Sequence, residues 1–177
     1  MRRFNCRRAC SPEGEDGHDS KVDRLDTTTR GIFWFLLTIS QINTNIHKMK
    51  IDNELLERLL ERAGENPRMR QNMDLRTSTE DCSQRMLNAL LPGTKVPVHR
   101  HPRSNESMII LKGRLDAILC DDNGTVTARY QLDPSSGHFG CVMPAGTWHT
   151  VEVMEPSVIY SAMDGRYGED GSECVEN

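Results

Sequence analysis

The sequence lacks an apolar run long enough to cross a membrane as a helix. Its longest run of this kind, residues 32–39, has eight residues, whereas a transmembrane helix needs roughly 20. The run also makes a poor signal peptide, because acidic residues precede it and no small-residue cleavage site follows closely. We therefore expect a cytoplasmic protein with no membrane partner, and an interfacial anchor at this run is the alternative.

The sequence also lacks an excess of basic residues. It has 22 Lys and Arg against 26 Asp and Glu, a net charge of -4, whereas a dedicated nucleic-acid binder carries a basic face. We expect no nucleic-acid partner. The six cysteines include no CxxC pair, and Cys6 and Cys10 with His18 nearby offer only part of a zinc ligand set. Reduced thiols are expected in place of a disulfide framework.

Motifs of metal-free catalysis are missing as well. There is no Gly-x-Ser-x-Gly elbow, no glycine-rich phosphate loop and no nucleophilic cysteine motif. Any chemistry is therefore expected to depend on a bound metal. The length of 177 residues predicts one domain with some additional chain.

Residues 1–48 differ in character from the rest of the chain. Residues 1–30 are polar and charged with almost no apolar periodicity, which is typical of disorder. We expect residues 1–48 to be disordered or an upstream extension, with Met49 as the true start. A native flexible tail is the alternative.

Residues 49–78 are expected to form a helical lead-in segment. An amphipathic helix is predicted over residues 52–63, with Asp52 as its N-cap and Gly64 as its end. Ile51 and Leu56 are spaced for a hydrophobic staple. The apolar face is also a candidate dimer interface, and it comprises Ile51, Leu55, Leu56, Leu59, Leu60 and Ala63.

Residues 79–167 have the pattern of a β domain. Short apolar or alternating segments are separated by turn signals, and they lie at residues 85–91, 107–111, 114–120, 125–132, 141–143, 149–154 and 157–162. This pattern predicts an all-β sandwich or barrel with one helix packed outside it. Residues 168–177 are expected to be a flexible tail.

Four residues form a candidate metal site, namely His99, His101, Glu106 and His149. Two histidines at i and i+2 on a strand project to the same face. Taken alone, such a pair is more often a surface or satisfied core feature. With Glu106 opening the next strand and His149 following a Pro-x-Gly turn, the set suits one divalent transition metal such as Fe, Mn, Zn or Ni. It would leave one or two coordination positions open.

The spacing of these residues resembles the two cupin motifs. The first motif is matched by Gly93-x5-His99-x-His101-x4-Glu106-x6-Gly113, and the core of the second by Pro144-x-Gly146-x2-His149. The resemblance implies a single-domain jelly-roll barrel that binds a metal through the four residues above. The second motif departs from the usual pattern at His138, where glycine is usual, and at Val153, where asparagine is usual.

Residues 51–167 further resemble the WbuC family of cupin-fold metalloproteins. The resemblance is carried by residues 84–94, 97–102, 111–116 and 144–151. It implies a bacterial protein of surface-polysaccharide biosynthesis that acts on a sugar or sugar nucleotide. The resemblance does not assign a reaction, and we expect a metal-dependent isomerase or epimerase, or a dioxygenase. The alternative is a non-catalytic module that binds a metal or a small ligand. A homodimer is a further expectation.

Several residues near the motifs are candidates for the pocket. Met108 shares the face of Glu106 and would form an apolar floor. Arg103 could meet an anionic substrate, with solvent exposure as the alternative, and Tyr160 could donate a hydrogen bond within the barrel. His138 is expected in a loop that could reach the barrel mouth. Two side chains are expected to point away from the metal, those of Arg100 and Trp148.

Overall fold

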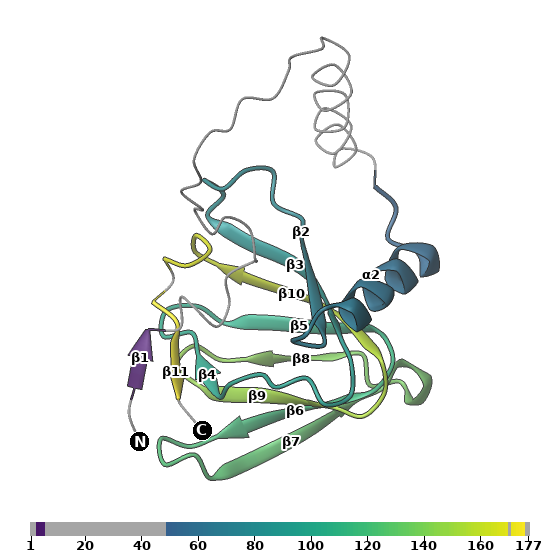
Figure 1. Ribbon diagram of the computed structural model, residues 1–177. Coiled ribbons are helices and arrows are strands. Elements are labelled where there is room, and N and C mark those ends of the chain that lie inside the picture. The colour runs from purple at the N-terminus through teal and green to yellow at the C-terminus, as the bar shows by residue number, and fades with distance from the viewer. Residues whose placement is uncertain (1–2, 6–48, 170, 176–177) are drawn as a thin grey trace, which may run out of the picture. The chain divides into compact units, whose positions relative to one another are not determined.

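The structure, a computed structural model, describes residues 3–5, 49–169 and 171–175 (Figure 1). The prediction that residues 1–48 are disordered concerns a segment almost entirely outside this range. Of that segment only strand β1 (Arg3–Asn5) is described, and it pairs antiparallel with β11 (Glu173–Val175). No helix within the described residues is both long and apolar enough to span a bilayer.

Helix α2 (Asn53–Glu65) forms as its sequence pattern predicts. Asp52 is the N-cap, and its carboxylate accepts a hydrogen bond of 3.2 Å from the backbone N–H of Leu55. The helix runs past Gly64 to a C-cap at Asn66, and Ile51 is 47% exposed in place of the expected staple. The other five residues of the apolar face are buried, and the helix contacts β2, β3 and β10. This face therefore packs within its own chain and is not a free dimer interface.

The remaining elements form two antiparallel sheets, as the sequence predicted (Figure 1). One sheet has the order β1-β11-β4-β9-β6-β7, with the further strands β4 (His99–Arg100), β6 (Leu115–Cys120), β7 (Val126–Leu132) and β9 (Trp148–Val153). The other has the order β2-β3-β10-β5-β8, with β2 (Arg70–Asp74), β3 (Ser83–Leu90), β5 (Glu106–Lys112), β8 (Gly140–Met143) and β10 (Ser157–Asp164). A short 3-10 helix, η3 (Pro134–Ser136), precedes β8. The chain crosses between the sheets at most connections, as in a jelly roll.

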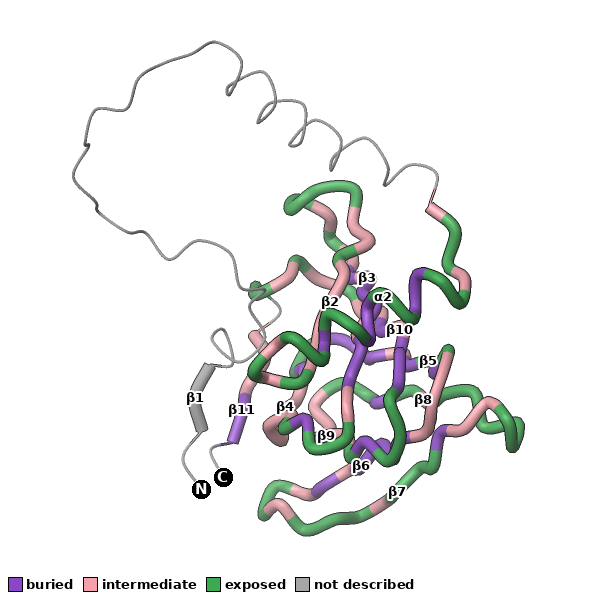
Figure 2. Tube along the Cα trace, turned by 45° about the vertical axis from the view of Figure 1, so that its right-hand side comes forward, coloured by how far each residue is buried: buried purple, intermediate pink, exposed green. Residues whose placement is uncertain are grey.

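The hydrophobic core lies between the two sheets. Its buried residues come from both layers: Leu90, Met108, Ile110, Leu115, Ala117, Leu132, Met143, Val153 and Ile159. Figure 2 shows long buried stretches on β10, whereas β7 at the edge of its sheet is largely exposed. A second cluster on the outer side of the first sheet comprises Ile118, Cys120, Trp148 and Val175. The two clusters fix the strands that carry the site residues.

Strands β1, β2 and β11 were not predicted from the sequence. β2 contains one apolar residue, Met73, and β11 has only three residues. β4 was expected to carry both His99 and His101, but it has two residues and ends at Arg100. β2 also shows that residues 49–78 are not helical throughout. The C-terminal segment differs from the expected flexible tail, because Cys174 and Val175 are buried in β11. Segments as short or as polar as these give no periodic signal of their own.

The cysteines correct one expectation. Cys82, Cys120 and Cys141 carry free thiols, as expected, but Cys174 is disulfide-bonded. The uniformly reduced state inferred from the absence of CxxC pairs is therefore wrong at this position. Spacing along the chain does not reveal a bond made by residues that only the fold brings together.

Candidate metal centre

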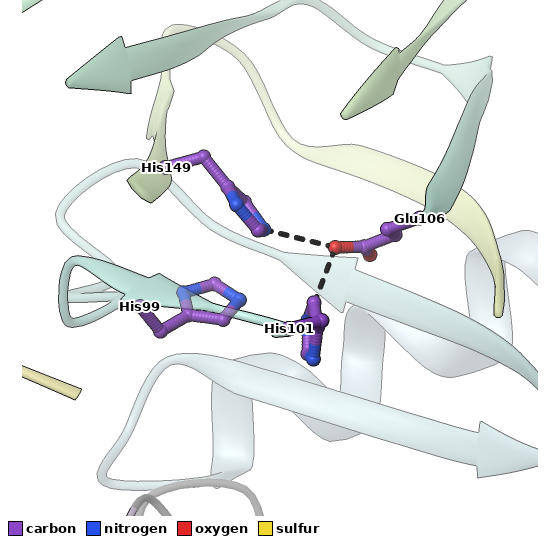
Figure 3. A group of neighbouring side chains, drawn as sticks. All are labelled: His99, His101, Glu106 and His149. Carbon is purple, nitrogen blue, oxygen red and sulfur yellow. Dashed lines mark hydrogen bonds and ion pairs between the residues drawn. The ribbon is translucent and has the colours of Figure 1, made fainter. Parts of the chain in front are cut away.

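The fold brings the four predicted ligands into one cluster (Figure 3). His99 lies on β4 and pairs directly with His149 on β9, so both imidazoles leave the first sheet on the same side. His101 follows β4, and the chain then turns so that Glu106 opens β5 in the opposite sheet. One ligand atom from each residue lies within 4.8 Å of all the others.

The Glu106 carboxylate lies among the imidazoles. Its Oε2 is 3.0 Å from Nε2 of His149 and 3.4 Å from Nε2 of His101. The His99 ring completes the group, with its centroid 4.2 Å from that of His149 and 5.2 Å from that of His101. Glu106, His101 and His149 are buried, and His99 is partly buried. The four donors therefore converge on one point at the edge of the core.

Each imidazole is held through its other nitrogen. Nδ1 of His99 donates to the carbonyl of Pro97, and Nδ1 of His149 donates to the carbonyl of Thr147, both at 2.9 Å. Nδ1 of His101 lies 2.8 Å from the Ser172 hydroxyl. A histidine anchored in this way turns Nε2 toward the cluster with its lone pair available, which is the usual state of a metal ligand.

The contact between Glu106 and His149 shows why a cation fits. A neutral imidazole that donates through Nδ1 presents a lone pair at Nε2, and the carboxylate also presents lone pairs. At 3.0 Å these two atoms need a positive group between or on them. A proton on the imidazole can supply it, and a metal ion can take the place of that proton.

The electrostatics of the site favour the protonation states of metal ligands. Burial and the neighbouring imidazoles of His149 and His101 lower the pKa of His99 to about 3. Burial by itself would raise the pKa of Glu106, but hydrogen bonds from His101 and His149 outweigh burial and hold it well below its ordinary range. At neutral pH the site thus contains a neutral His99 and an ionised Glu106.

Three histidines and one carboxylate form a nitrogen-rich donor set. Such a set suits Fe, Mn, Co, Ni, Cu or Zn better than Mg or Ca, which prefer oxygen ligands. Four protein ligands fill a tetrahedral zinc site, whereas an ion with five or six ligands keeps room for an external molecule. A site that is open to substrate therefore favours the second kind of ion.

The two motifs are joined by backbone hydrogen bonds. The N–H of Gly146 donates to the carbonyl of His101 at 2.9 Å, and the N–H of Ala145 donates to Oδ1 of Asn105, also at 2.9 Å. Gly146 has a φ of 79°, a left-handed conformation that favours glycine. The turn before His149 is thus fixed to the loop that joins His101 to Glu106.

A wall of sulfur-containing side chains lies beside Glu106. Met108 is buried on the Glu106 face, where the alternation predicted it, and Met143 on β8 is the cross-strand partner of Glu106. Cys141 Sγ lies 3.4 Å from Met143 Sδ. Burial, with a contribution from Glu106, raises the pKa of Cys141 to about 11, so this thiol is neutral and weakly nucleophilic at neutral pH.

Three other predicted pocket residues lie away from the cluster. Tyr160 pairs with Leu87 and Ile109, on the face of its sheet opposite to Glu106. Arg103 is exposed and donates to the carbonyl of Glu169. His138 lies on an exposed turn beyond the end of β5 that is distant from Glu106.

The two residues expected to point away do so. The Arg100 guanidinium lies 4.5 Å from the centre of the Trp148 ring, on the outer side of the sheet. Arg100 also forms an ion pair of 2.7 Å with Glu173 of β11. These contacts hold β4, β9 and β11 together behind the metal cluster.

Two polar residues near the site were missed from the sequence. Ser172 lies in an acidic, glycine-containing segment that gives no sign of a contact with His101. Gln84 lies on β3 and shares the face of Glu106, because Gln84 pairs with Met163 and Met163 pairs with Glu106. The alternation of β3 could have placed Gln84 on an inward face, but only the strand order places it beside the site.

Comparison with known proteins gives the following likenesses. Residues 51–132 match a family model described as "Domain of unknown function (DUF6016)", a range that contains α2, His99, His101 and Glu106 but not His149. No curated protein matches the chain.

Among solved structures, the chain is similar to oxalate decarboxylase from Lactobacillus farciminis, with 14% identity, a TM-score of 0.45 and coverage of 59% of this chain and 30% of that one. It is also similar to KdgF from Halomonas sp., with 17% identity and a TM-score of 0.44. This likeness covers 55% of this chain and 79% of KdgF. A third likeness is to the cupin domain of Cnp3 from Schizosaccharomyces pombe, with 13% identity, a TM-score of 0.44 and coverage of 54% and 64%. The chain thus spans less than a third of the oxalate decarboxylase, and its own fold is defined by the strand pairing described above.

Proposed function

We propose that this chain is a metal-dependent cupin enzyme acting on a small polar molecule. One divalent transition metal is bound by His99, His101, Glu106 and His149. The observation that carries the proposal is the convergence of these four donors, each imidazole being anchored through Nδ1 and turned inward through Nε2. A bound metal would polarise a carbonyl or hydroxyl oxygen, or activate water, at its open position.

The chain's own residues give the metal site rigid surroundings from which water is partly excluded. Glu106 contributes the only negative charge of the donor set, so a divalent ion leaves the site with a net positive charge that attracts an oxygen ligand. The buried side chains of Met108 and Met143 exclude water on one side. This low-polarity wall strengthens electrostatic interactions with a bound molecule.

The substrate class follows from the resemblance to the WbuC family. We propose a sugar or sugar nucleotide of bacterial surface-polysaccharide biosynthesis, converted by isomerisation, epimerisation or oxygenation. The support is the resemblance of residues 84–94, 97–102, 111–116 and 144–151 to that family.

A non-catalytic binding module is the second candidate. The observation that favours it is the wall facing the cluster, where the inward positions of β3, β5 and β10 carry no titratable side chain other than Glu106. Their polar residues are Gln84, Asn88, Ser157 and Ser161, which can hold a ligand but are poor general acids or bases.

Turnover separates the two candidates. The protein is loaded in parallel with Fe(II), Mn(II), Ni(II) and Zn(II), incubated with free sugars and nucleotide sugars, and followed by NMR. The enzyme proposal expects new product signals with the wild type and none with His149→Ala. If the protein binds a sugar but converts none with any of the four metals, the enzyme proposal is contradicted and the binding-module proposal is supported.

A further inference from the structure

Gln84 has a buried side-chain N–H group without an acceptor among the described residues. Its residue is 5% exposed, and within the described part of the chain its Nε2 makes no hydrogen bond. A buried N–H group without an acceptor destabilises a folded protein, so native structures rarely keep one without a use. A ligand oxygen at this place would supply the missing acceptor.

The position of Gln84 connects it to the metal cluster. Gln84, Met163 and Glu106 form one cross-strand row on neighbouring strands β3, β10 and β5, with all three side chains on the same face. Two strand spacings put the Cα atoms of Gln84 and Glu106 roughly 10 Å apart. The two side chains face the same interior, with the side chain of Met163 between them in the row.

The surroundings of Gln84 are polar and include one ion pair. Asp74 of β2 pairs with Met86 and so shares the face of Gln84, and its carboxylate binds the buried guanidinium of Arg76 at 2.6 Å, which offsets that charge. Ser161 and Asn88 face the same interior, and the inward positions of β3, β5 and β10 carry no Lys or Arg. Amide and hydroxyl groups recognise hydroxyl and carbonyl oxygens, whereas phosphates and free carboxylates are usually bound by Arg or Lys.

We propose that Gln84 binds a hydroxyl or carbonyl oxygen of a small neutral hydroxycarbonyl compound whose other oxygens reach the metal. The proposal rests on the metal site proposed above and narrows its ligand. The part of the ligand that contacts the inward side chains of β3, β5 and β10 is uncharged, and any phosphate group of the ligand does not contact them. Gln84 is thereby a specificity-determining residue with no role in holding the metal.

The test uses the Co(II)-loaded full chain and follows its visible spectrum during titration. D-xylulose is the neutral probe, D-xylulose 5-phosphate is its charged counterpart, and hydroxyacetone is a short hydroxyketone that can chelate the metal without extending to Gln84. Gln84→Leu is expected to weaken D-xylulose binding about tenfold, the effect of one hydrogen bond. Hydroxyacetone binding and Co(II) affinity should remain unchanged, and the wild type should bind D-xylulose more tightly than its phosphate.

Stability distinguishes ligand binding from a structural role. Because Gln84→Leu removes a buried N–H group without an acceptor, the ligand-free variant should have a Tm equal to or above that of the wild type. Gln84→Met gives the same comparison with an unbranched side chain. Gln131→Leu, at an exposed position on β7, is the matched control and should leave D-xylulose binding unchanged.

The outcomes separate this inference from the metal site. If the wild type fails to bind Co(II), the proposed function itself is contradicted. If it binds Co(II) but binds D-xylulose no better than Gln84→Leu does, the role of Gln84 is overturned while the metal site stands. A lower Tm or a failure to fold in both Gln84 variants would assign this amide a structural role and would also overturn the inference.

Discussion

The Ser172 hydroxyl lies 2.8 Å from Nδ1 of His101, although 71 positions separate the two residues. His99 and His149 are anchored differently, each by the carbonyl of the residue two positions earlier in the chain. One ligand of the cluster therefore depends on the C-terminal segment, which β11 fixes against β4. The candidate metal site is thus assembled from three separate parts of the chain.

Removing the Ser172 hydroxyl should weaken metal binding while leaving the fold intact. We expect Ser172→Ala to lower metal affinity about tenfold, at the lower end of the effect of removing a partner that orients a ligand. Competition with a fluorescent chelator measures the affinity. Ser136→Ala, at an exposed position, is the matched control. An unchanged affinity in Ser172→Ala would show that His101 does not need this contact.

Neutralising Glu106 should have a larger effect. Glu106→Gln keeps the size of the side chain but removes the only negative charge of the donor set, so metal affinity should fall by more than about 100-fold. The same chelator competition measures it. Glu152→Gln neutralises an exposed carboxylate paired with Arg129 and should leave affinity unchanged. Equal affinities of the two variants would remove Glu106 from the ligand set.

The metal-free protein should lose stability in mild acid. The pKa of His99 is lowered from 6.5 to about 3 in the folded protein. Between these values the unfolded chain binds more protons than the folded one, so stability is greatest above pH 6.5 and falls as the pH is lowered toward 3. At pH 5 the contribution of His99 to this loss is about 2 kcal/mol.

Urea unfolding of chelator-treated protein at pH 7.5 and pH 5.0 measures this effect. His99→Gln cannot take up the proton and should therefore show a smaller difference between the two pH values. Two results would refute the role of His99 in this pH dependence. One is a wild type with the same free energy of unfolding at both pH values, and the other is a His99→Gln variant that loses as much stability at pH 5.0 as the wild type does.

The helix should contribute stability through its buried face. Leu59 is 4% exposed, and Leu59→Ala should lower the free energy of unfolding by about 2–5 kcal/mol. Leu111 is 37% exposed on β5, so Leu111→Ala is a matched control with an expected loss below about 1 kcal/mol. Chemical denaturation compares the two variants. Similar losses would mean that α2 packs weakly against the sheet.

The sequence predicted the elements whose residues follow a regular period. α2 has five apolar residues on one side, and the hairpin of β6 and β7 has alternation and a turn at residues 122–124, so both could be recognised locally. The clustering of the four candidate ligands could be predicted because their spacing follows the two cupin motifs, which place them on neighbouring strands and turns. β2 and β11 could not, because their residues become strand-like only when a neighbouring strand accepts their hydrogen bonds.

The errors around the pocket have a similar physical cause. The run Val158–Ile159–Tyr160 is apolar on both sides of the strand, so its sequence does not show which side chain faces the metal. The pairing register decides this, and it turns Ile159 inward and Tyr160 outward. Arg103 lies in a loop, where its contact with the carbonyl of Glu169 depends on the path of the C-terminal segment.

Metal content is the most direct test of the central claim. Protein purified without chelator, and again after reconstitution with Fe(II), Mn(II), Ni(II) or Zn(II), is assayed by inductively coupled plasma mass spectrometry beside His101→Ala and His149→Ala. The structure predicts about one metal ion per wild-type chain and a large loss in both variants. A wild type holding less than about 0.2 ions per chain after reconstitution, or variants that retain the full content, would contradict it.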